Sequence, residues 1–443
     1  MKIIILAGGE GKRMWPIQTD KCLIPFLGKP LLYHNLAQIK QNVDGEFIIV
    51  ANPQSKDPVE KVAQELELNY TIAIQREPKG MADAILSAKD LIDGELLVLN
   101  AEDQLDPKIY KAVMNVKADV VVGSLKVDKY FPGGYIKATG DPTSSAKGGL
   151  RGAGRVQAIV EKPGEGNEPS SLVKLVVDYF QDGTKLIRYL QSTTSDKDDV
   201  YEKALDKMIA DGIGVKFAKY SGIWIPLKYP WQILDILGAL LSKIEQKISS
   251  GANVSDKAII TGPVVIEDGA KVFEGAVIKG PCYIGKNCIV GNNSMVRESN
   301  LEEGCVTGFS SDITRSYIGA NCWFHTNYVG DCVIEGDFGM GSGAVLANLR
   351  LDDHTIRVHA NGELIDSGRH KLGLIVGKGS RVGVNASTMP GARIGSNSLV
   401  GPGVVLKEDV KDNTKILVKQ EYTLSQHTPA LTSYDQFREK LEK

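Results

Sequence analysis

Two patterns of hydrophobic residues divide the chain near residue 225. Before it, short runs of β-branched and aliphatic residues, suited to buried strands, alternate with stretches that have the spacing of helices. The runs lie at residues 2–6, 46–50, 95–99 and 120–122, and the expected helices lie at 31–42, 56–67 and 81–91. This alternation predicts a doubly wound α/β sheet. Residues 228–250 repeat hydrophobic positions every three to four residues, which predicts one linking helix.

A different period governs the chain beyond residue 258. Aliphatic residues recur at every sixth position, at Ile260, Ile266, Val272, Ile278, Ile284, Val290 and Val296. The period returns at Val376, Val382, Ile394, Val400 and Leu406, with Thr388 filling the missing step. Neither an α-helix nor a flat strand has this period, whereas a coil of triangular turns places one such residue inside on each face. The period is lost over 300–315, and the polar residues 349–372 fit a loop that leaves the coil.

These patterns set the expected domain boundaries. We expect a first domain at 1–227, a linker helix at 228–255 and the coil at 256–410. The tail at 411–443 is expected to contain a short helix near its end.

Composition narrows the class of protein. The net charge of −2 argues against partners held by bulk electrostatics, such as nucleic acid or a membrane surface. No run approaches the ~20 apolar residues that a membrane span needs, and the N-terminus lacks the pattern of a secretion signal. We therefore expect a cytoplasmic protein with small-molecule substrates. The six cysteines lack the paired spacing of a zinc site, which predicts reduced packing thiols.

The first strand-like run ends in a glycine-rich turn. Residues 7–13 contain Gly8, Gly9 and Gly11 and end in Arg13. Glycines at the carboxyl end of a buried parallel strand let backbone N–H groups approach phosphate oxygens, and the arginine adds positive charge. The spacing matches neither the dinucleotide-binding pattern nor the Walker pattern. From the exposed N–H groups and the arginine, we interpret the turn as a nucleoside triphosphate site.

Both halves together resemble the bifunctional N-acetylglucosamine-1-phosphate uridyltransferase/glucosamine-1-phosphate acetyltransferases, and especially their archaeal-type relatives. The resemblance rests on the loop at residues 6–16, on the period of six, and on the segments 325–331, 341–344 and 347–350. It implies an α/β plus all-β fold, in which an N-terminal Rossmann-like nucleotidyltransferase domain precedes a left-handed parallel β-helix of hexapeptide repeats.

The resemblance assigns roles within the first domain. It implies that the nucleotide is bound by Leu6, Ala7, Gly8, Gly9, Gly11, Gln75 and Gly80. It gives the catalytic role of neutralising the phosphates to Arg13 and Lys21, and the binding of the sugar phosphate to Gly134, Glu161 and Lys162. The amide of Gln75 offers one donor and one acceptor, which complements the imide edge of uracil or thymine. We therefore expect the NTP to be UTP.

The expected Mg²⁺ site departs from the family pattern. The resemblance places Glu102, with Asp103 beside it, where the family has its first metal-binding aspartate. The second carboxylate falls on Pro226, which cannot bind a metal, and residues 172–176 lack the expected asparagine and glycine. The first domain is therefore open to three interpretations: a slow enzyme, an enzyme of altered specificity, or a purely structural domain.

The second half matches the acetyltransferase motifs more fully. The resemblance implies that acetyl transfer from acetyl-CoA uses His325 as general base, with Tyr328 and Asn348 positioning the amino sugar and the thioester. An imidazole with an unperturbed pKa near ~6.5 can accept a proton at neutral pH. Acetyl-CoA and the amino sugar are further expected to bind Arg350, Arg369, Lys371 and Asn385. By analogy we expect a homotrimer with the acetyl site between neighbouring coils.

The expected function is the synthesis of a UDP-activated, N-acetylated amino sugar by acetyl transfer and nucleotidyl transfer. Two alternatives remain open. One is a mannose- or glucose-1-phosphate nucleotidylyltransferase with a structural β-helix. The other is a degenerate subunit for ligand sensing or assembly.

Overall fold

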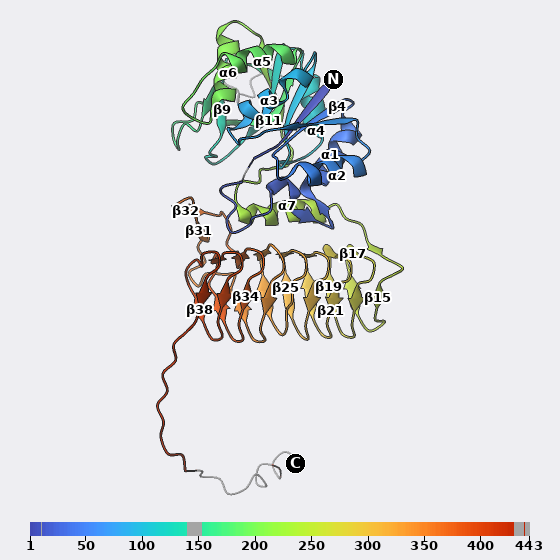
Figure 1. Cartoon of the computed structure of the whole chain (residues 1–443), viewed down its shortest axis with the longest axis vertical. Helices are drawn as coiled ribbons and strands as arrows, with labels where there is room; N and C mark the ends of the chain where they lie inside the picture. The colour runs from blue at the N-terminus through green and yellow to red at the C-terminus, as the bar shows by residue number, and fades with distance from the viewer. Residues whose placement is uncertain (10, 140–152, 429–437, 439–443) are drawn as a thin grey trace, which may run out of the picture.

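The computed structural model describes residues 1–443 except 10, 140–152, 429–437 and 439–443. An α/β domain stands on one side of an elongated coil of short strands, and an extended tail leaves the far end of the coil (Figure 1). Apart from Arg438, the helix expected near the C-terminus falls on residues outside the described part. No helix in the described part of the chain is long and apolar enough to cross a membrane.

The N-terminal domain is built on a nine-stranded sheet with the order β5-β4-β1-β6-β11-β8-β12-β10-β9. The first four strands in this order are parallel, and β11 runs antiparallel to both of its neighbours, β6 and β8. The bounds are β1 (Lys2–Ala7), β4 (Glu46–Ala51), β5 (Tyr70–Ile74), β6 (Leu96–Asn100), β8 (Val120–Lys126), β9 (Gly134–Ala138), β10 (Ala153–Glu161), β11 (Leu172–Phe180) and β12 (Val215–Tyr220). Short pairs are formed by β2 (Pro25–Phe26) with β3 (Lys29–Pro30) and by β7 (Gln104–Leu105) with β13 (Trp224–Ile225).

Helices cover both faces of this sheet because successive residues of a buried strand point to opposite sides. In β1, Ile3 and Ile5 belong to the core under α1 (Leu31–Asn42), α2 (Lys56–Glu65) and α4 (Lys108–Met114). Ile4 and Leu6 belong to the core under α3 (Met81–Ser87), α5 (Gly183–Gln191) and α6 (Val200–Ala210). Single 3-10 turns lie at η1 (Lys21–Leu23) and η2 (Lys89–Leu91). The doubly wound α/β class is confirmed.

The second half is a β-helix whose strands form three parallel sheets. The first sheet contains β14 (Lys247–Ile248), β17 (Val264–Ile266), β20 (Cys282–Ile284), β23 (Asn300–Leu301), β26 (Tyr317–Ile318), β28 (Val333–Ile334), β33 (Ile375–Val376) and β36 (Arg393–Ile394). The second contains β15 (Asn253–Val254), β18 (Lys271–Val272), β21 (Ile289–Val290) and β24 (Val306–Thr307), then β29 (Gly339–Met340), β34 (Arg381–Val382), β37 (Leu399–Val400) and β39 (Lys415–Ile416). The third contains β16 (Ile259–Thr261), β19 (Val277–Lys279), β22 (Met295–Arg297), β25 (Asp312–Thr314), β27 (Tyr328–Gly330), β30 (Val345–Leu346), β35 (Ser387–Thr388) and β38 (Val405–Leu406).

The period of six arises because each coil spends six residues on each of these three sheets. In the third sheet Ile260 pairs with Ile278 and Ile278 with Val296, eighteen residues further on each time. The next coils are shorter, since Ile284 pairs with Leu301, seventeen residues on. This shortening explains why the period is lost after residue 300. All six cysteines are free and buried, as predicted.

The polar segment at 349–372 leaves the coil, as predicted, and folds into an antiparallel hairpin. Its strands are β31 (Arg357–Ala360) and β32 (Glu363–Asp366), which rise from the coil towards the N-terminal domain (Figure 1). The base of the hairpin is buried at Ile356 and Val358, within the core shared by the two domains.

The N-terminal domain packs on the outer face of the first sheet. The shared core joins α7 (Ile233–Leu241), residues of the 14–31 segment, and Tyr283, Tyr317, Val333 and Ile375 of the coil. α7 is shorter than the helix predicted over 228–250. A 3-10 turn, η3 (Pro230–Gln232), precedes it, and β14, which follows it, already belongs to the coil. Glu335 of the coil accepts hydrogen bonds from the backbone N–H groups of Gln18 and Thr19, at 2.8 and 2.7 Å. The loop that follows the glycine turn is thus held by the coil.

Candidate functional sites

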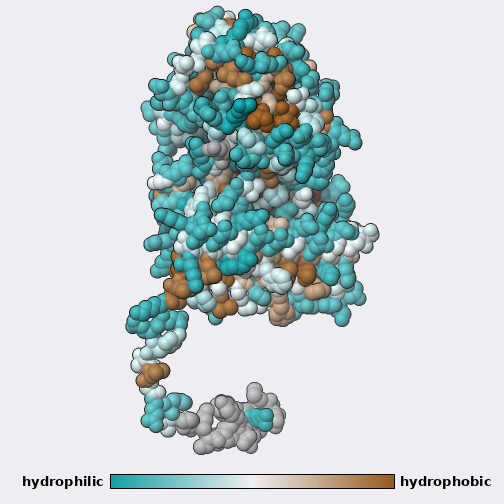
Figure 2. Space-filling model, viewed as in Figure 1, coloured by the Kyte–Doolittle hydropathy of each residue, from teal (hydrophilic) through white to brown (hydrophobic). Residues whose placement is uncertain are grey.

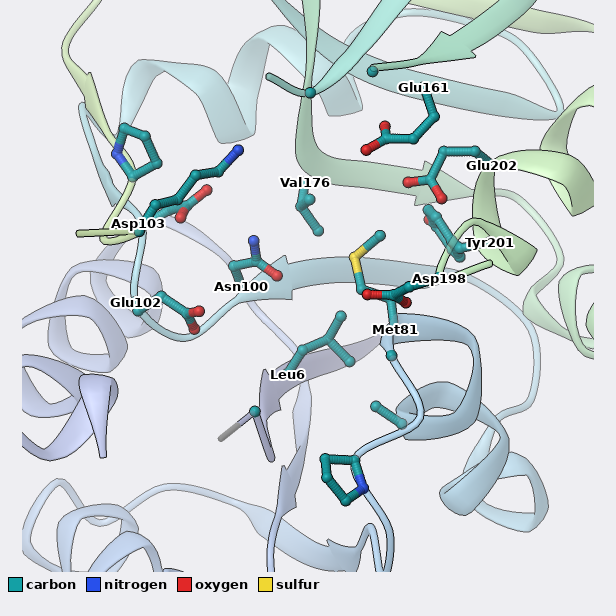
Figure 3. Close-up of a pocket in the computed structure, with 18 of the residues that line it drawn as sticks. Leu6, Met81, Asn100, Glu102, Asp103, Glu161, Val176, Asp198, Tyr201 and Glu202 are labelled. Atoms are coloured by element: carbon teal, nitrogen blue, oxygen red, sulfur yellow. The ribbon is translucent and has the colours of Figure 1, made fainter. Parts of the chain in front are cut away.

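A cavity of about 540 Å³ opens in the N-terminal domain beside the ends of β1 and β6 (Figure 3). It brings together thirteen residues predicted from the sequence: Leu6, Gly8, Gly9, Gly11, Arg13, Lys21, Gln75, Gly80, Glu102, Asp103, Gly134, Glu161 and Lys162. Ala7 is buried at the end of β1 behind this lining. Asn361, at the turn of the β31–β32 hairpin, also lines the cavity, so the coil contributes to it.

The glycine turn approaches Gln75 closely. A Cβ atom on Gly8 would lie 2.5 Å from Oε1 of Gln75, so only glycine fits without displacing that side chain. The amide nitrogen of Gln75 donates to the Gly80 carbonyl oxygen at 3.1 Å and to Asp83 Oδ2 at 2.9 Å. Both hydrogens of this amide are therefore used within the protein, and Oε1 remains as an acceptor at the wall of the cavity.

The two carboxylates expected at the metal site point apart and already have partners (Figure 3). Lys21 forms an ion pair with Glu102, and Trp224 Nε1 donates to Asp103 Oδ2 at 3.1 Å. Burial opposes the charge on Lys21, but Glu102 outweighs it and raises the pKa of the lysine. Burial, aided by the charge of Glu102, raises the pKa of Asp103 to about 6. In the described part of the chain no group of three or more His, Cys, Asp or Glu side chains is arranged to hold a metal ion.

The opposite side of the cavity holds charged residues that sequence reasoning missed. One of them, Glu202, faces the predicted Glu161, with Tyr201 beneath them (Figure 3). Lys174 Nζ lies 2.6 Å from Asp178 Oδ2, and their side chains are 2% and 0% exposed. Lys174 lies within residues 172–176, the segment that lacks the expected asparagine and glycine, and Asp178 lies two residues beyond it. A lysine and an aspartate four positions apart in one strand lie on the same face, which is the signal that could have revealed them.

Burial also perturbs the acids near that pair. It raises the pKa of Glu202 to about 7, with Lys174 opposing the shift and Glu161 adding to it. Lys162 Nζ lies 2.9 Å from Glu161 Oε1, so the predicted sugar-binding pair forms an ion pair within the cavity wall. This region can therefore present both acidic and basic groups to a polar ligand.

Another missed residue, Lys228, lies two positions after Pro226, and both line the cavity. Its Nζ donates to the Pro132 carbonyl oxygen at 2.9 Å and lies 3.9 Å from the centroid of the Phe131 ring. No motif marks this residue, because the loop that carries Phe131 contacts it only in the folded chain.

The predicted acetyltransferase residues lie on the coil. His325 is exposed between Trp323 of the second sheet and β27 of the third. The buried Asn348 donates through Nδ2 to the Tyr328 hydroxyl at 3.1 Å and to Asp331 Oδ2 at 2.5 Å. Asp331 in turn accepts two hydrogen bonds from Arg315, both at 2.8 Å. The structure thus joins Tyr328 and Asn348 in one network and adds Asp331 to it.

Three of the four residues expected to bind acetyl-CoA and the amino sugar have structural partners. Arg350 pairs with Asp352 on the surface, and Arg369 pairs with Asp235 of α7 across the domain boundary. Asn385 has a φ of 53° at a coil corner, where its Oδ1 lies against Gly343 of the preceding coil. Corner asparagines elsewhere in the coil, such as Asn287 and Asn397, have the same geometry. Lys371 is exposed.

Comparison with known proteins matches both domains to described families. The family described as nucleotidyl transferase matches residues 2–225. The family described as bacterial transferase hexapeptide (six repeats) matches residues 247–298. This chain therefore combines an N-terminal nucleotidyltransferase domain with a second domain of the hexapeptide transferase type.

Full-length relatives have the same combination. The chain is 30% identical, over 420 residues, to the "Bifunctional sugar-1-phosphate nucleotidylyltransferase/acetyltransferase" of Sulfurisphaera tokodaii, covering 93% of this chain and 98% of that one. It is also 30% identical, over 429 residues, to the "Bifunctional protein GlmU" of Methanocaldococcus jannaschii, covering 95% and 98%.

Proposed function

The chain belongs to the family of bifunctional sugar-1-phosphate nucleotidylyltransferase/acetyltransferases, and from this premise we propose that it makes a UDP-activated, N-acetylated amino sugar. The N-terminal cavity transfers a nucleotidyl group from an NTP to a sugar 1-phosphate. The coil transfers an acetyl group from acetyl-CoA to the amine of an amino-sugar 1-phosphate. The observation that carries this proposal is the convergence of the glycine turn, Gln75 and the Glu161–Lys162 pair on one cavity.

In the nucleotidyl step, a phosphate oxygen of the sugar attacks the α-phosphorus of the NTP. A new P–O bond forms as the bond to the leaving pyrophosphate breaks. Fixed cations stabilise the charge that develops on the phosphate oxygens, and Arg13 and Lys162 lie in the cavity to do so. The unused Oε1 of Gln75 can accept the N3–H of a uracil ring, which favours UTP.

Mg²⁺ is proposed to accompany the nucleotide. This ion commonly uses one or two protein carboxylates together with substrate phosphates and water. Glu102 and Asp103 both line the cavity, and each would hold the ion after release of its present partner, Lys21 or Trp224. The residues present therefore fit an ion held mainly by the nucleotide. When bound, it would neutralise phosphate charge.

In the acetyl step, His325 takes the proton from the amine as it attacks the thioester carbonyl carbon. The carbon–sulfur bond of the thioester then breaks, and the proton held by His325 passes to the leaving thiolate, so coenzyme A leaves as the thiol. Because the Tyr328 hydroxyl accepts its hydrogen bond from Asn348, its own hydrogen is available to donate to the developing oxyanion. Lys371, exposed on the coil, is proposed to bind a phosphate group of either substrate.

The coil is proposed to work as a homotrimer. His325 is exposed in the single chain, and exposed hydrophobic residues occur on nearby coils at Phe309, Trp323, Val345 and Val384. Figure 2 shows hydrophobic residues gathered along the side of the coil that faces away from the N-terminal domain. A second copy placed there would cover these residues and enclose His325. The free cysteines support work in a reducing compartment, for which we propose the cytoplasm.

A panel of NTPs and sugar 1-phosphates, scored by mass spectrometry of nucleotide-sugar products, tests the nucleotidyl step. We expect the largest yield with UTP and an N-acetylated amino-sugar 1-phosphate. Acetyl-CoA consumption with glucosamine 1-phosphate tests the other step, and it should disappear in His325→Ala. Acetyl transfer that persists in this variant would remove the proposed base.

One observation favours a second candidate. Lys21 and Trp224 occupy the carboxylates of the expected metal site, and Pro226 provides none. These contacts fit an N-terminal domain that binds nucleotide sugars without turnover. Binding of UTP by calorimetry without pyrophosphate release, for every sugar phosphate in the panel, would establish this alternative.

A further inference from the structure

Lys228 places a positive charge in the cavity wall. The reaction proposed above assigns no role to this residue. In the described part of the chain its ammonium group forms no ion pair, and its one hydrogen bond goes to the Pro132 carbonyl oxygen. An ammonium group has three hydrogens to donate, so two remain for a ligand or for water. The side chain lines the cavity, which gives a ligand access to them.

The packing around Lys228 fixes where this charge lies. The face of the Phe131 ring supports the ammonium group, and Trp224 packs edge-on against the same ring with centroids 4.7 Å apart. Trp224 also donates to Asp103, so Lys228, Phe131, Trp224 and Asp103 form one connected wall. A cation over an aromatic face gains stabilisation without the ring neutralising its charge.

The charged groups around Lys228 favour the binding of an anion at this residue. Asp103 and Glu161 favour its protonated form, whereas Arg13 and Lys162 oppose it. Burial has the largest effect, and together these influences lower the pKa of Lys228 to about 8. Three cations around one cavity repel one another when the cavity is empty, and a polyanion between them would relieve that repulsion.

We propose that Lys228 is a phosphate-binding residue of the nucleotidyl-transfer site, contacting phosphate oxygens where the sugar phosphate meets the nucleotide. It supplies a fixed positive charge at the wall where Pro226 leaves no carboxylate for a metal ion. Arg13 approaches this place from the glycine turn and Lys162 from the end of β10. The assignment rests on the proposed function for the identity of the two substrates.

The test measures binding without metal, so that turnover is not needed. The full-length protein is titrated with UTP, and separately with glucosamine 1-phosphate, in excess EDTA by isothermal calorimetry. Lys228→Met keeps an unbranched side chain one atom shorter and removes the charge, and we expect affinity for at least one ligand to fall by about tenfold or more. Lys219→Met is the matched control, because Lys219 is exposed on β12. It should bind both ligands as the wild type does.

A second variant covers the case in which Lys228→Met does not fold. Lys228→Arg keeps a charge that does not titrate in this range, so its affinity should fall less from pH 7 to pH 9 than that of the wild type, which also loses the charge of Lys228 above about pH 8. Affinities of Lys228→Met within twofold of the wild type, or identical pH profiles for the wild type and Lys228→Arg, would overturn the proposal. Failure of both ligands to bind the wild type would also overturn it. Binding that depends on Lys228 without turnover would instead refute only the proposed nucleotidyl reaction.

Discussion

The buried pair of Lys174 and Asp178 makes the N-terminal domain vulnerable to a single substitution. In Lys174→Met, Asp178 would lose the partner at 2.6 Å and keep one donor, the Tyr201 hydroxyl at 2.7 Å. Its Oδ1 already lacks a partner among the described residues. Removing one member of a buried ion pair costs about 3–5 kcal/mol, because the remaining charge stays uncompensated. We therefore expect a loss of this size in the free energy of unfolding at pH 7.5.

Urea denaturation followed by the helical circular dichroism signal measures this loss, since all described α-helices lie within residues 31–241. Lys203→Met is the matched control, because Lys203 is half-exposed beside Asp199 and should cost less than about 1 kcal/mol. The double variant Lys174→Met/Asp178→Asn should recover most of the loss, since no buried charge remains. A loss below about 1 kcal/mol in Lys174→Met would refute the reasoning, as would a double variant no more stable than the single one.

Three further predictions follow from the contacts. Burial raises the pKa of Glu302, which bonds the Gly28 N–H at the domain boundary, to about 7 from 4.5. The folded chain thus binds the carboxyl proton of Glu302 more tightly than the unfolded chain does. The contribution of this proton to the free energy of unfolding is therefore fully present below about pH 4.5 and is lost as the pH rises through 7. Glu302→Gln should remove about 2.5 kcal/mol of pH dependence between pH 5 and pH 8, measured by denaturation at the two values; parallel pH profiles would contradict it. Gly8→Ala should weaken UTP binding by about tenfold or more, because its Cβ displaces Gln75, and unchanged calorimetric affinity would count against this. Arg369→Met should change the KM for acetyl-CoA less than about twofold, because Arg369 pairs with Asp235; a tenfold rise in steady-state assays would restore its expected role in phosphate binding.

The fold class followed from periodicity, because periodicity records which side chains are buried. Seven aliphatic residues at steps of six required a coil with three faces, and the strand pairing of Ile260, Ile278 and Val296 confirms it. The prediction of a helix over 228–250 was too long because periodicity records burial and does not show where one element ends and the next begins. Hydrophobic spacing continues past α7, but Ile248 is already committed to pairing with Ile266 in the coil.

The cavity was predictable where one segment supplies a recognisable motif, as the glycine turn and Glu161–Lys162 do. It was not predictable where function depends on contacts between distant segments. Lys228 is held by Phe131 and Pro132, almost one hundred residues earlier, and Arg369 is paired with α7 of the other domain. The sequence alone does not show whether a charged residue contacts a substrate or pairs with a carboxylate of the protein. The structure distinguishes these two cases.

The division of work between the two domains is tested most directly by one assay with two variants. Glucosamine 1-phosphate, acetyl-CoA and UTP are supplied together, and free coenzyme A and pyrophosphate are measured. We predict that the wild type releases both, that His325→Ala loses coenzyme A release, and that Arg13→Met releases coenzyme A at the wild-type rate but no pyrophosphate. A wild type that releases neither, or an Arg13→Met variant that still releases pyrophosphate at the wild-type rate, would contradict two independent transferase sites in this chain.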